Sequence, residues 1–267
     1  MPPLGPRSAE VSRLRRQIRD RKRGDDFIVV EGMRLVSEAL NAGMVPTRVV
    51  IGEKSRSDLV DVLGHIEVRP LVVVDDAFKS LCSTVSPQPL LSLFTRPKYE
   101  TPTTLETDDL LLVSVGVADP GNLGTMIRAA AAVRASGVLT FGGVDPWAQK
   151  TLRSSAGTAF KMEIVDPGID DPGTDIATRL AELRQLGARV VATAANAETV
   201  YSDLDLSGAP VAIVVGSESQ GLHRDSLGDQ VDDWVRIPMA PGVESLNVAM
   251  ATTLMLYEAR RAAGQRL

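Results

Sequence analysis

The second half of the chain repeats one pattern, in which a short apolar run is followed by a turn and a segment of helical length. The apolar runs are LLLVSVGV, GVLTFGG, KMEIV, ARVVATA, PVAIVVG and DWVRIP. Strands that alternate with helices form a mostly parallel sheet with helices on both faces. The pattern therefore predicts an α/β domain with such a sheet over residues 109–267.

A smaller α/β unit precedes this domain. The runs FIVV, TRVVI, LVVVD and LLSLF alternate with helical patterns at residues 31–42, 57–63 and 75–81. The stretch TRPKYETPTTLETDD, which follows, contains prolines and has no apolar periodicity, as is typical of a linker. We therefore expect an amino-terminal domain over residues 1–95 and a linker over residues 96–108.

Composition excludes several classes of protein. The chain of 267 residues has 44% apolar and 24% charged residues, and its apolar runs are too short to cross a bilayer. A single cysteine, Cys82, excludes an internal disulfide and a cysteine metal cluster, and two histidines argue against a histidine-rich metal site. We expect a cytoplasmic protein whose chemistry needs no metal and no membrane.

Positive charge is concentrated near the start of the chain. The net charge is -5, yet residues 7–23 contain eight basic and two acidic residues. Val11, Leu14 and Ile18 recur at helical spacing, which predicts a helix with one docked face. The remaining surface is rich in arginine and suits a nucleic-acid backbone, although a solvated basic helix without a partner explains it equally well. The candidate phosphate-binding residues are Arg13, Arg15, Arg16 and Arg19.

The closing stretch IPMAPGVESLNVAMATTLMLYEARR predicts a buried helix that begins near Leu246. Ser245 is the candidate N-cap, and Pro241-Gly242 predicts a sharp turn before it. A buried, capped helix needs no chemistry, so a purely structural role stays open. Asn247 is unexplained by that role, because an amide just inside a helix lowers helix propensity and requires hydrogen-bond partners.

Two further loops follow apolar strands, at the edge of a parallel sheet where binding residues gather. VADPGNLGTMIRAA contains Asn122 and, six residues later, Arg128, so both side chains can face the same end of the sheet. VVGSESQGL contains Gly216, Glu218 and Gly221. Neither of the glycine patterns of dinucleotide-binding and P-loop proteins is present at these positions.

These three stretches, in this order, resemble the signature motifs of the SpoU/TrmH branch of the SPOUT RNA methyltransferases. The segment FIVVEGMRLVSEAL is similar to the substrate-binding domain that many of these enzymes carry. The resemblance implies a ribose 2'-O-methyltransferase that uses S-adenosyl-L-methionine. It also implies a homodimer formed by the carboxyl-terminal domain, and a deep trefoil knot in that domain.

The resemblance also implies roles for individual residues. In the family, the residue that matches Arg128 is proposed to help deprotonate the ribose hydroxyl. Because guanidinium normally stays protonated, we expect Arg128 to orient the target phosphate and stabilise the developing alkoxide, unless it forms a structural ion pair, and we leave proton removal open. Asn122 would fix Arg128 or the ribose, or cap a helix; Glu218 would hold loop backbone or an arginine of the second subunit, and Asn247 would bond to Asn122. Ser245 would lie beside the reacting methyl group or the ribose. The cofactor would lie on three loops, at Thr193, Ala194, Val215, Gly216, Gly221, Ile237, Met239, Ser245 and Leu246.

A second basic cluster lies in WAQKTLRSSAGTAFKM. A similar segment in the family lies beside the target nucleotide, so Lys150, Arg153, Ser154 and Ser155 are expected to hold RNA phosphates, and the turn at Gly157 to admit the RNA backbone. The expected substrate is ribosomal RNA. Transfer RNA is the enzymatic alternative, and a non-catalytic RNA-binding or assembly protein on the same fold is the other.

Overall fold

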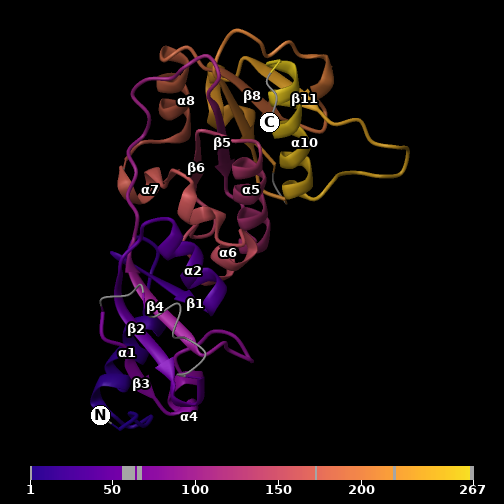
Figure 1. Cartoon of the computed structure of the whole chain (residues 1–267). Helices are drawn as coiled ribbons and strands as arrows, with labels where there is room; N and C mark the ends of the chain where they lie inside the picture. Colours follow the sequence, from indigo (N-terminus) through magenta and orange to yellow (C-terminus); the bar gives the residue numbers. More distant parts are fainter. Residues whose placement is uncertain (1, 56–63, 65–67, 172, 219–220, 265–267) are drawn as a thin grey trace.

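The computed structural model describes residues 2–55, 64, 68–171, 173–218 and 221–264, which form two domains, each built on one sheet (Figure 1). The larger sheet has the strand order β7-β6-β5-β10-β8-β11-β9, and all of its described pairings are parallel. This confirms the predicted parallel sheet. Its strands are β5 (Leu110–Val115), β6 (Gly137–Phe141), β7 (Ile164–Val165), β8 (Arg189–Thr193), β9 (Thr199–Val200), β10 (Val211–Val215) and β11 (Asp233–Arg236).

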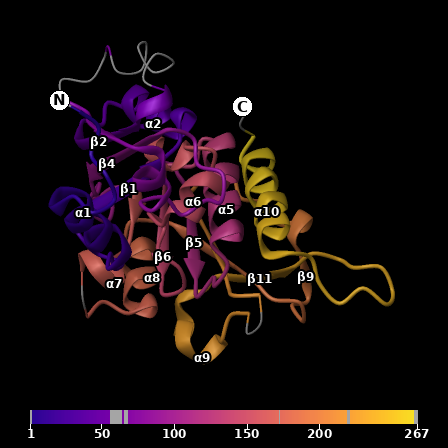
Figure 2. The ribbon, with the colours of Figure 1, turned by 90° about the horizontal axis from the view of Figure 1, so that it is seen from below.

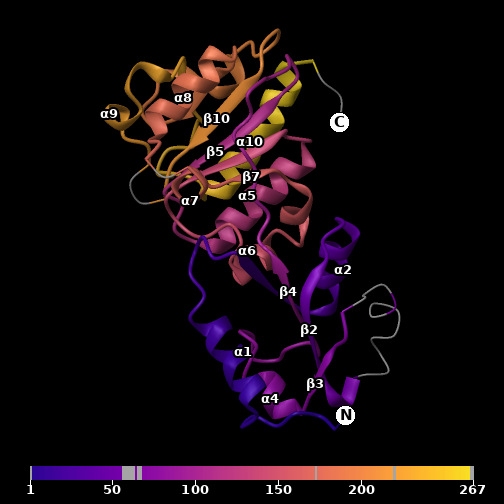
Figure 3. The same ribbon diagram turned by 90° about the vertical axis from the view of Figure 1, so that its left-hand side faces the viewer.

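Helices cover both faces of this sheet, with α8 and α10 on opposite sides (Figure 3). Because side chains alternate along a strand, Leu110 and Leu112 pack in the core that contains α5 and α10, whereas Leu111 and Val113 pack in the core that contains α8. A strand buried on both faces must be apolar throughout, which explains the continuous runs in the sequence. The helices are α5 (Pro120–Ala132), α6 (Gln149–Ser154), α7 (Pro167–Asp170), α8 (Ile176–Gln185), α9 (Arg224–Leu227) and α10 (Val248–Ala262).

The smaller sheet has the order β1-β4-β2-β3, in which β4 is antiparallel to both neighbours and β2 is parallel to β3. Helix α1 packs on one face through Val11 and Leu14, and α2 belongs to the core that continues into the larger domain. The helix predicted at residues 57–63 lies outside the described residues. The elements are α1 (Ala9–Arg19), β1 (Phe27–Glu31), α2 (Met33–Asn41), β2 (Pro46–Gly52), β3 (Leu71–Val73), α4 (Asp75–Lys79) and β4 (Leu90–Thr95).

Among the described residues, four ion pairs join the amino-terminal part of the chain to the larger domain. One links Lys161 to Glu38 of α2 at 2.7 Å, and we call the other three the seam. Their N–O distances are each 2.7 Å, and they link Arg21 to Asp145, Arg23 to Asp166 and Arg96 to Asp170. The Asp166 side chain is 0% exposed and that of Arg96 is 1% exposed. Arg21 and Arg23 belong to the basic segment for which the sequence predicts phosphate binding. That interpretation is wrong for these two residues, because acidic side chains of the larger domain already hold their guanidinium groups.

The closing helix differs from its prediction in two ways. It begins at Val248 with Asn247 as its N-cap, so the assignment of Ser245 as the cap is wrong. Its first half is also not buried all round, because Met250 is 63% exposed, Leu254 40% and Tyr257 46%. These three residues, which we call the α10 stripe, are spaced by about one helical turn and form an apolar surface that faces solvent.

No helix in the described part of the chain has the length and apolar character that a membrane span needs.

Candidate functional site

The first motif folds into the turn between β5 and α5. Asp119 is the N-cap of α5, and its Oδ1 accepts hydrogen bonds from the backbone nitrogens of Gly121 at 2.7 Å and Asn122 at 3.0 Å. Pro120 occupies the first turn, where its missing N–H costs nothing. Because Asp119 caps the helix, the capping role considered for Asn122 is wrong, and the amide of Asn122 is available to other groups.

The Asn122 amide joins all three motifs. Its Nδ2 donates to Oε1 of Glu218 at 2.5 Å, and its Oδ1 accepts from Nδ2 of Asn247 at 3.0 Å. The contact predicted between Asn247 and Asn122 is thus present. Asn247 Oδ1 also accepts from the backbone nitrogens of Ala249 and Met250 and so caps α10. We call Asp119, Asn122, Glu218 and Asn247 the Asn122 network.

Lys150 of α6 connects this network to the second basic cluster. Its Nζ lies 3.1 Å from Oδ2 of Asp119. The hydrogen bond from Lys150 lowers the pKa of the Asp119 carboxyl, and the backbone N–H groups of Asn122 and Gly121 lower it further. A carboxylate held by these donors keeps the start of α5 in place, and with it Asn122.

Arg128 lies on the same helix as Asn122, and it is exposed. Among the residues that the structure describes, its guanidinium has no hydrogen-bond or ion-pair partner. The structural ion pair considered for Arg128 is therefore not formed with any of them. Nor does Asn122 fix Arg128, because the amide of Asn122 bonds to Glu218 and Asn247.

The residues expected at the cofactor lie at the carboxyl ends of three neighbouring strands and on the loops that follow. Thr193 and Val215 are the last residues of β8 and β10. Ala194, Gly216 and Ile237 directly follow β8, β10 and β11. The backbone turns tightly after β10, because a Cβ added at Gly216 would lie 2.3 Å from the carbonyl carbon and oxygen of Gly221. Only glycine fits such an approach.

The third loop lies apart from these strand ends. The loop between Ile237 and Asn247 projects from the body of the domain between β11 and α10 (Figures 1 and 2). Met239 is partly exposed, whereas Ser245 and Leu246 are exposed. The structure thus brings Thr193, Val215 and Ile237 to one edge of the sheet and leaves Met239, Ser245 and Leu246 on an open loop.

The second basic cluster is only partly available to a ligand. Ser155 is 0% exposed and its hydroxyl donates to the carbonyl of Leu152, so the predicted contact with a phosphate is wrong. Ser154 donates to the carbonyl of Lys150. A Cβ added at Gly157 would meet the side chain of Glu38 at 2.8 Å, so this turn packs against the smaller domain and not against RNA. Arg153 donates to Ser83 Oγ at 3.1 Å.

The arginines of α1 divide into two groups. Arg13 and Arg16 are exposed and have no hydrogen-bond or ion-pair partner within the described ranges. Arg15 donates to Ser80 Oγ and to the carbonyl of Pro6, and Arg19 pairs with Asp20 at 2.8 Å. Helix α1 therefore presents free positive charge at Arg13 and Arg16.

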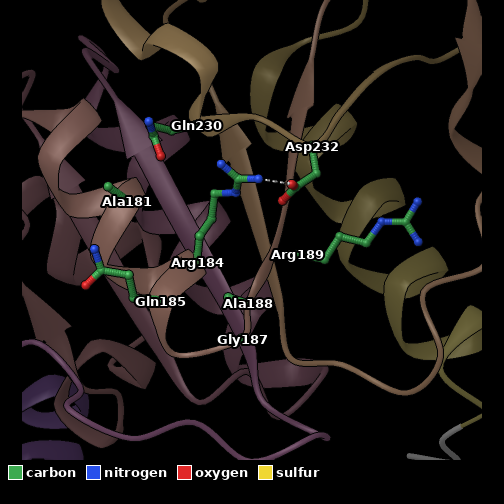
Figure 4. A pocket seen from close by; sticks show the side chains of 8 residues that line it. All are labelled: Ala181, Arg184, Gln185, Gly187, Ala188, Arg189, Gln230 and Asp232. Atoms are coloured by element: carbon green, nitrogen blue, oxygen red, sulfur yellow. Dashed lines mark ion pairs between the residues drawn. The ribbon is translucent and has the colours of Figure 1, made fainter.

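A cavity of about 690 Å³ lies elsewhere, beside the amino-terminal ends of β8 and β11 (Figure 4). Arg184 and Asp232, which line it, form an ion pair at 2.8 Å. None of the network residues lines it. In parallel sheets ligands bind at the carboxyl ends of the strands, so we do not place the site there. The described residues also contain no group of histidine, cysteine and acidic side chains that could hold a metal ion.

Asp119, which caps α5 in the first motif, was not among the predicted site residues. An Asp before Pro at the end of an apolar run is a helix N-terminal signature, so the signal was present. The hydrogen bond that Glu218 accepts from Asn122 was also not predicted, because the two residues lie 96 positions apart and only the fold brings them together.

The chain is similar in sequence to known proteins. Residues 109–257 match the SpoU rRNA Methylase family, and residues 7–92 match the MRM3-like substrate binding domain. A 23S rRNA (guanosine(2553)-2'-O)-methyltransferase of Bacillus subtilis is 30% identical over 245 residues, which cover 91% of this chain and 91% of that protein. The mitochondrial rRNA methyltransferase 3 of Mus musculus is 31% identical over 283 residues, which cover 88% of this chain and 67% of that protein.

A solved structure is also similar. The crystal structure of an AdoMet-bound rRNA methyltransferase from Sinorhizobium meliloti has a TM-score of 0.79 and 27% sequence identity, and the match covers 95% of each chain. The family match spans all three motifs that the Asn122 network joins. The family predicted from the motifs is thereby confirmed, and this chain belongs to the SpoU rRNA Methylase family.

Proposed function

We propose that this protein transfers a methyl group from S-adenosyl-L-methionine to a ribose 2'-hydroxyl in ribosomal RNA. The observation that carries the proposal is the Asn122 network, because it joins the three motifs at the carboxyl ends of the strands. The relatives named above support the reaction and the RNA class. The protein must lie in the same compartment as its ribosomal RNA substrate. We propose that this compartment is the cytoplasm.

The strand ends fit the proposed cofactor. The backbone approach of Gly216 to Gly221 keeps side chains off the end of β10, and Ala194 at the end of β8 is small. Exposed apolar side chains on the third loop, Val243 and Leu246, are of the kind that an adenosyl group can cover. When bound, S-adenosyl-L-methionine supplies an electrophilic methyl group on sulfur. We propose that the loop between Ile237 and Asn247 moves toward the strand ends when the cofactor binds.

The side chains of the site would align the ribose and stabilise charge. Asn122 and Asn247 hold one another in a fixed geometry, which can position a sugar hydroxyl for in-line displacement. Arg128, whose donors are unused within the described part of the chain, can bind the neighbouring phosphate and stabilise the alkoxide as the proton leaves. Guanidinium stays protonated near neutral pH, so its role is electrostatic. Glu218 would hold the Asn122 amide in place.

We propose further that two copies associate through the α10 stripe. Met250, Leu254 and Tyr257 form an exposed apolar surface, and such a surface is stabilised when it packs against the same stripe of a second copy. The free energy of association would come from burying these side chains. The trefoil knot, the domain limits at residues 95 and 109, and RNA binding by the smaller domain are parts of the same proposal.

The test is transfer of a labelled methyl group from S-adenosyl-L-methionine to total ribosomal RNA and to total transfer RNA, followed by mapping of alkali-resistant linkages. We expect label in ribosomal RNA at one resistant linkage, because 2'-O-methylation blocks hydrolysis there. Label in transfer RNA alone would show that the substrate is transfer RNA and not ribosomal RNA. No transfer to either RNA, together with no cofactor binding in calorimetry, would favour an RNA-binding or assembly protein on the same fold.

A further inference from the structure

Helices α5 and α10 lie side by side in the larger domain (Figures 1 and 2), and polar contacts join them at both ends. At their starts, Nδ2 of Asn247 donates to Oδ1 of Asn122. At their ends, Arg260 of α10 donates to the carbonyl of Val133, the C-cap of α5. The two helices therefore run in the same direction and are attached to each other at two places.

The two attachments fix the register of the helices. Asn122 and Val133 are about 17 Å apart along α5, and Asn247 and Arg260 are about 20 Å apart along α10. The side chain of Arg260 spans the difference, because side chains in a helix point back toward its start. Apolar packing between the helices is not directional and permits small sliding movements, whereas the two polar contacts are satisfied in one register only.

Arg260 binds three backbone carbonyls although it is only 7% exposed. Its Nε donates to the carbonyl of Val133 at 2.7 Å, its Nη1 to that of Asp108 at 2.6 Å, and its Nη2 to that of Arg134. The last carbonyls of a helix lack partners within the helix and carry the negative end of its dipole, so a cation is stabilised there. One guanidinium thus joins the end of α5 to α10 and to the chain that precedes β5.

The backbone at Arg134 makes the end of α5 dependent on this guanidinium. The φ of Arg134 is 53°, in the left-handed region that glycine favours after a helix and that is unfavourable for a residue with a side chain. Such a conformation persists where surrounding contacts hold it, and Nη2 of Arg260 holds the carbonyl of Arg134. We therefore expect the last turn of α5 to shift when Arg260 is replaced.

Arg128 lies between the two attachments, about 9 Å along the helix from Asn122 and about 7.5 Å from Val133. Its side chain is exposed and has no hydrogen-bond or ion-pair partner among the described residues, so the backbone of α5 sets where its guanidinium can reach. A displacement of about 1 Å at a reacting centre can lower a rate by about 100-fold. A shift at the end of α5 is therefore enough to impair methyl transfer.

We propose that Arg260 is a positioning residue, which fixes the end of α5 and through it the place of Arg128 during methyl transfer. The proposal rests on the function proposed above. It assigns a part in the reaction to a buried side chain at the opposite end of α5 from the Asn122 network.

The test is a double-mutant cycle in kcat/KM for methyl transfer, in which Arg260→Met is made in the wild-type protein and in Arg128→Ala. In the wild-type protein, we expect Arg260→Met to lower kcat/KM by about tenfold or more. In Arg128→Ala, it should change kcat/KM by less than about twofold, because the side chain that Arg260 positions is already absent. The melting temperature should fall equally in both backgrounds, since Arg260 has the same backbone contacts in both.

A conservative variant and a matched control accompany the cycle. Arg260→Lys keeps the buried charge but loses the planar fork of donors, so its kcat/KM should lie between those of Arg260→Met and the wild-type protein. If Arg260→Met does not fold, the cycle is measured with Arg260→Lys. The control is Arg261→Met, because Arg261 follows on the same helix, is exposed, and pairs with Glu258 of that helix at 2.8 Å. This variant should keep the wild-type kcat/KM.

Two results would overturn the positioning role and leave the proposed function intact. One is a wild-type kcat/KM in a folded Arg260 variant, and the other is an equal fold-loss of kcat/KM in both backgrounds of the cycle. A wild-type protein that transfers no methyl group to ribosomal or transfer RNA would overturn both proposals.

Discussion

The seam and the Asn122 network are both made of polar side chains that join distant parts of the chain, yet they differ in burial. In the seam, Asp166 and Arg96 are enclosed and their charges are paired. In the network, Glu218 and Asn247 are exposed. A buried charge that loses its partner is costly, whereas an exposed amide or carboxylate can exchange partners with water or a ligand. The buried pairs of the seam are therefore suited to fix the two domains against each other. The exposed groups of the network are suited to bind a ligand.

We expect the largest change in the free energy of unfolding from a substitution that removes an ion pair of the seam. Asp166→Ala leaves the Arg23 guanidinium without its carboxylate, and loss of one partner of a buried pair costs about 3–5 kcal/mol. Urea unfolding should show a free energy of unfolding lower by this amount. The control is Asp20→Ala, since Asp20 pairs with Arg19 in the open, where it should have no measurable effect. Equal unfolding midpoints for both variants would contradict the structural role of the seam.

Arg128→Ala tests the opposite case, a charged side chain without a partner among the described residues. We expect kcat/KM for methyl transfer to fall by about 10²–10³, because a positioned donor for the developing charge is lost. The free energy of unfolding should not change, since no described residue bonds to this side chain. Arg69→Ala serves as the control for loss of one exposed arginine. Wild-type turnover in Arg128→Ala would remove Arg128 from the site.

Two substitutions at Asn247 separate its structural and functional roles. Asn247→Ala loses the N-cap of α10, which should lower the free energy of unfolding by about 1 kcal/mol. Asn247→Asp keeps the acceptor for the cap but loses the Nδ2 donor to Asn122. Both variants should lose at least about tenfold in kcat/KM, because the link between the first and third motifs is gone.

The result for Asn247→Asp is decisive here. Stability close to wild type together with reduced methyl transfer would assign the amide nitrogen a role in the site. If the aspartate variant is as active as the wild-type protein, the contact with Asn122 serves only to hold α10.

The smallest expected effect concerns Asp119. Lys150 and two backbone N–H groups lower its pKa below the usual 3.8, so its contribution to stability is complete above pH 3.8 and is lost as the pH falls through the lowered pKa. In Lys150→Met, the carboxyl should titrate closer to 3.8 in an NMR titration of Asp119. An unchanged midpoint would show that Lys150 does not hold this carboxylate.

The fold could be predicted where burial leaves a pattern in the sequence. The strands β5 and β10 are apolar throughout because both of their faces are covered, and the helices between them keep a regular spacing of apolar residues. Strand β9 has only two residues, too few for a pattern, and it was not predicted. The α10 stripe was predicted to be buried because its residues are apolar. Apolar character alone does not distinguish side chains packed in the core from side chains exposed on the surface.

The site could be predicted only in part, for a related reason. The motifs identified Asn122 and Asn247, and their contact is present in the structure. The arginines that are available to bind RNA were harder to predict, because Arg16 and Arg23 lie in the same basic segment and the sequence does not show which of them is paired. Only the fold shows that Asp166, 143 positions away, holds Arg23 and leaves Arg16 free within the described chain. Ser155 was predicted to bind an RNA phosphate because the sequence does not show that its side chain is buried and that its hydroxyl donates to the backbone.

The most direct test measures methyl transfer to ribosomal RNA by Asn122→Ala, the variant that removes the residue of the first motif that is hydrogen-bonded to the other two. We predict a fall in kcat/KM of about tenfold or more while the free energy of unfolding stays near that of the wild-type protein, because Glu218 and Asn247, the hydrogen-bond partners of Asn122, are exposed and can bond to water instead. Wild-type kcat/KM in a folded Asn122→Ala variant would contradict the claim that this network assembles the site.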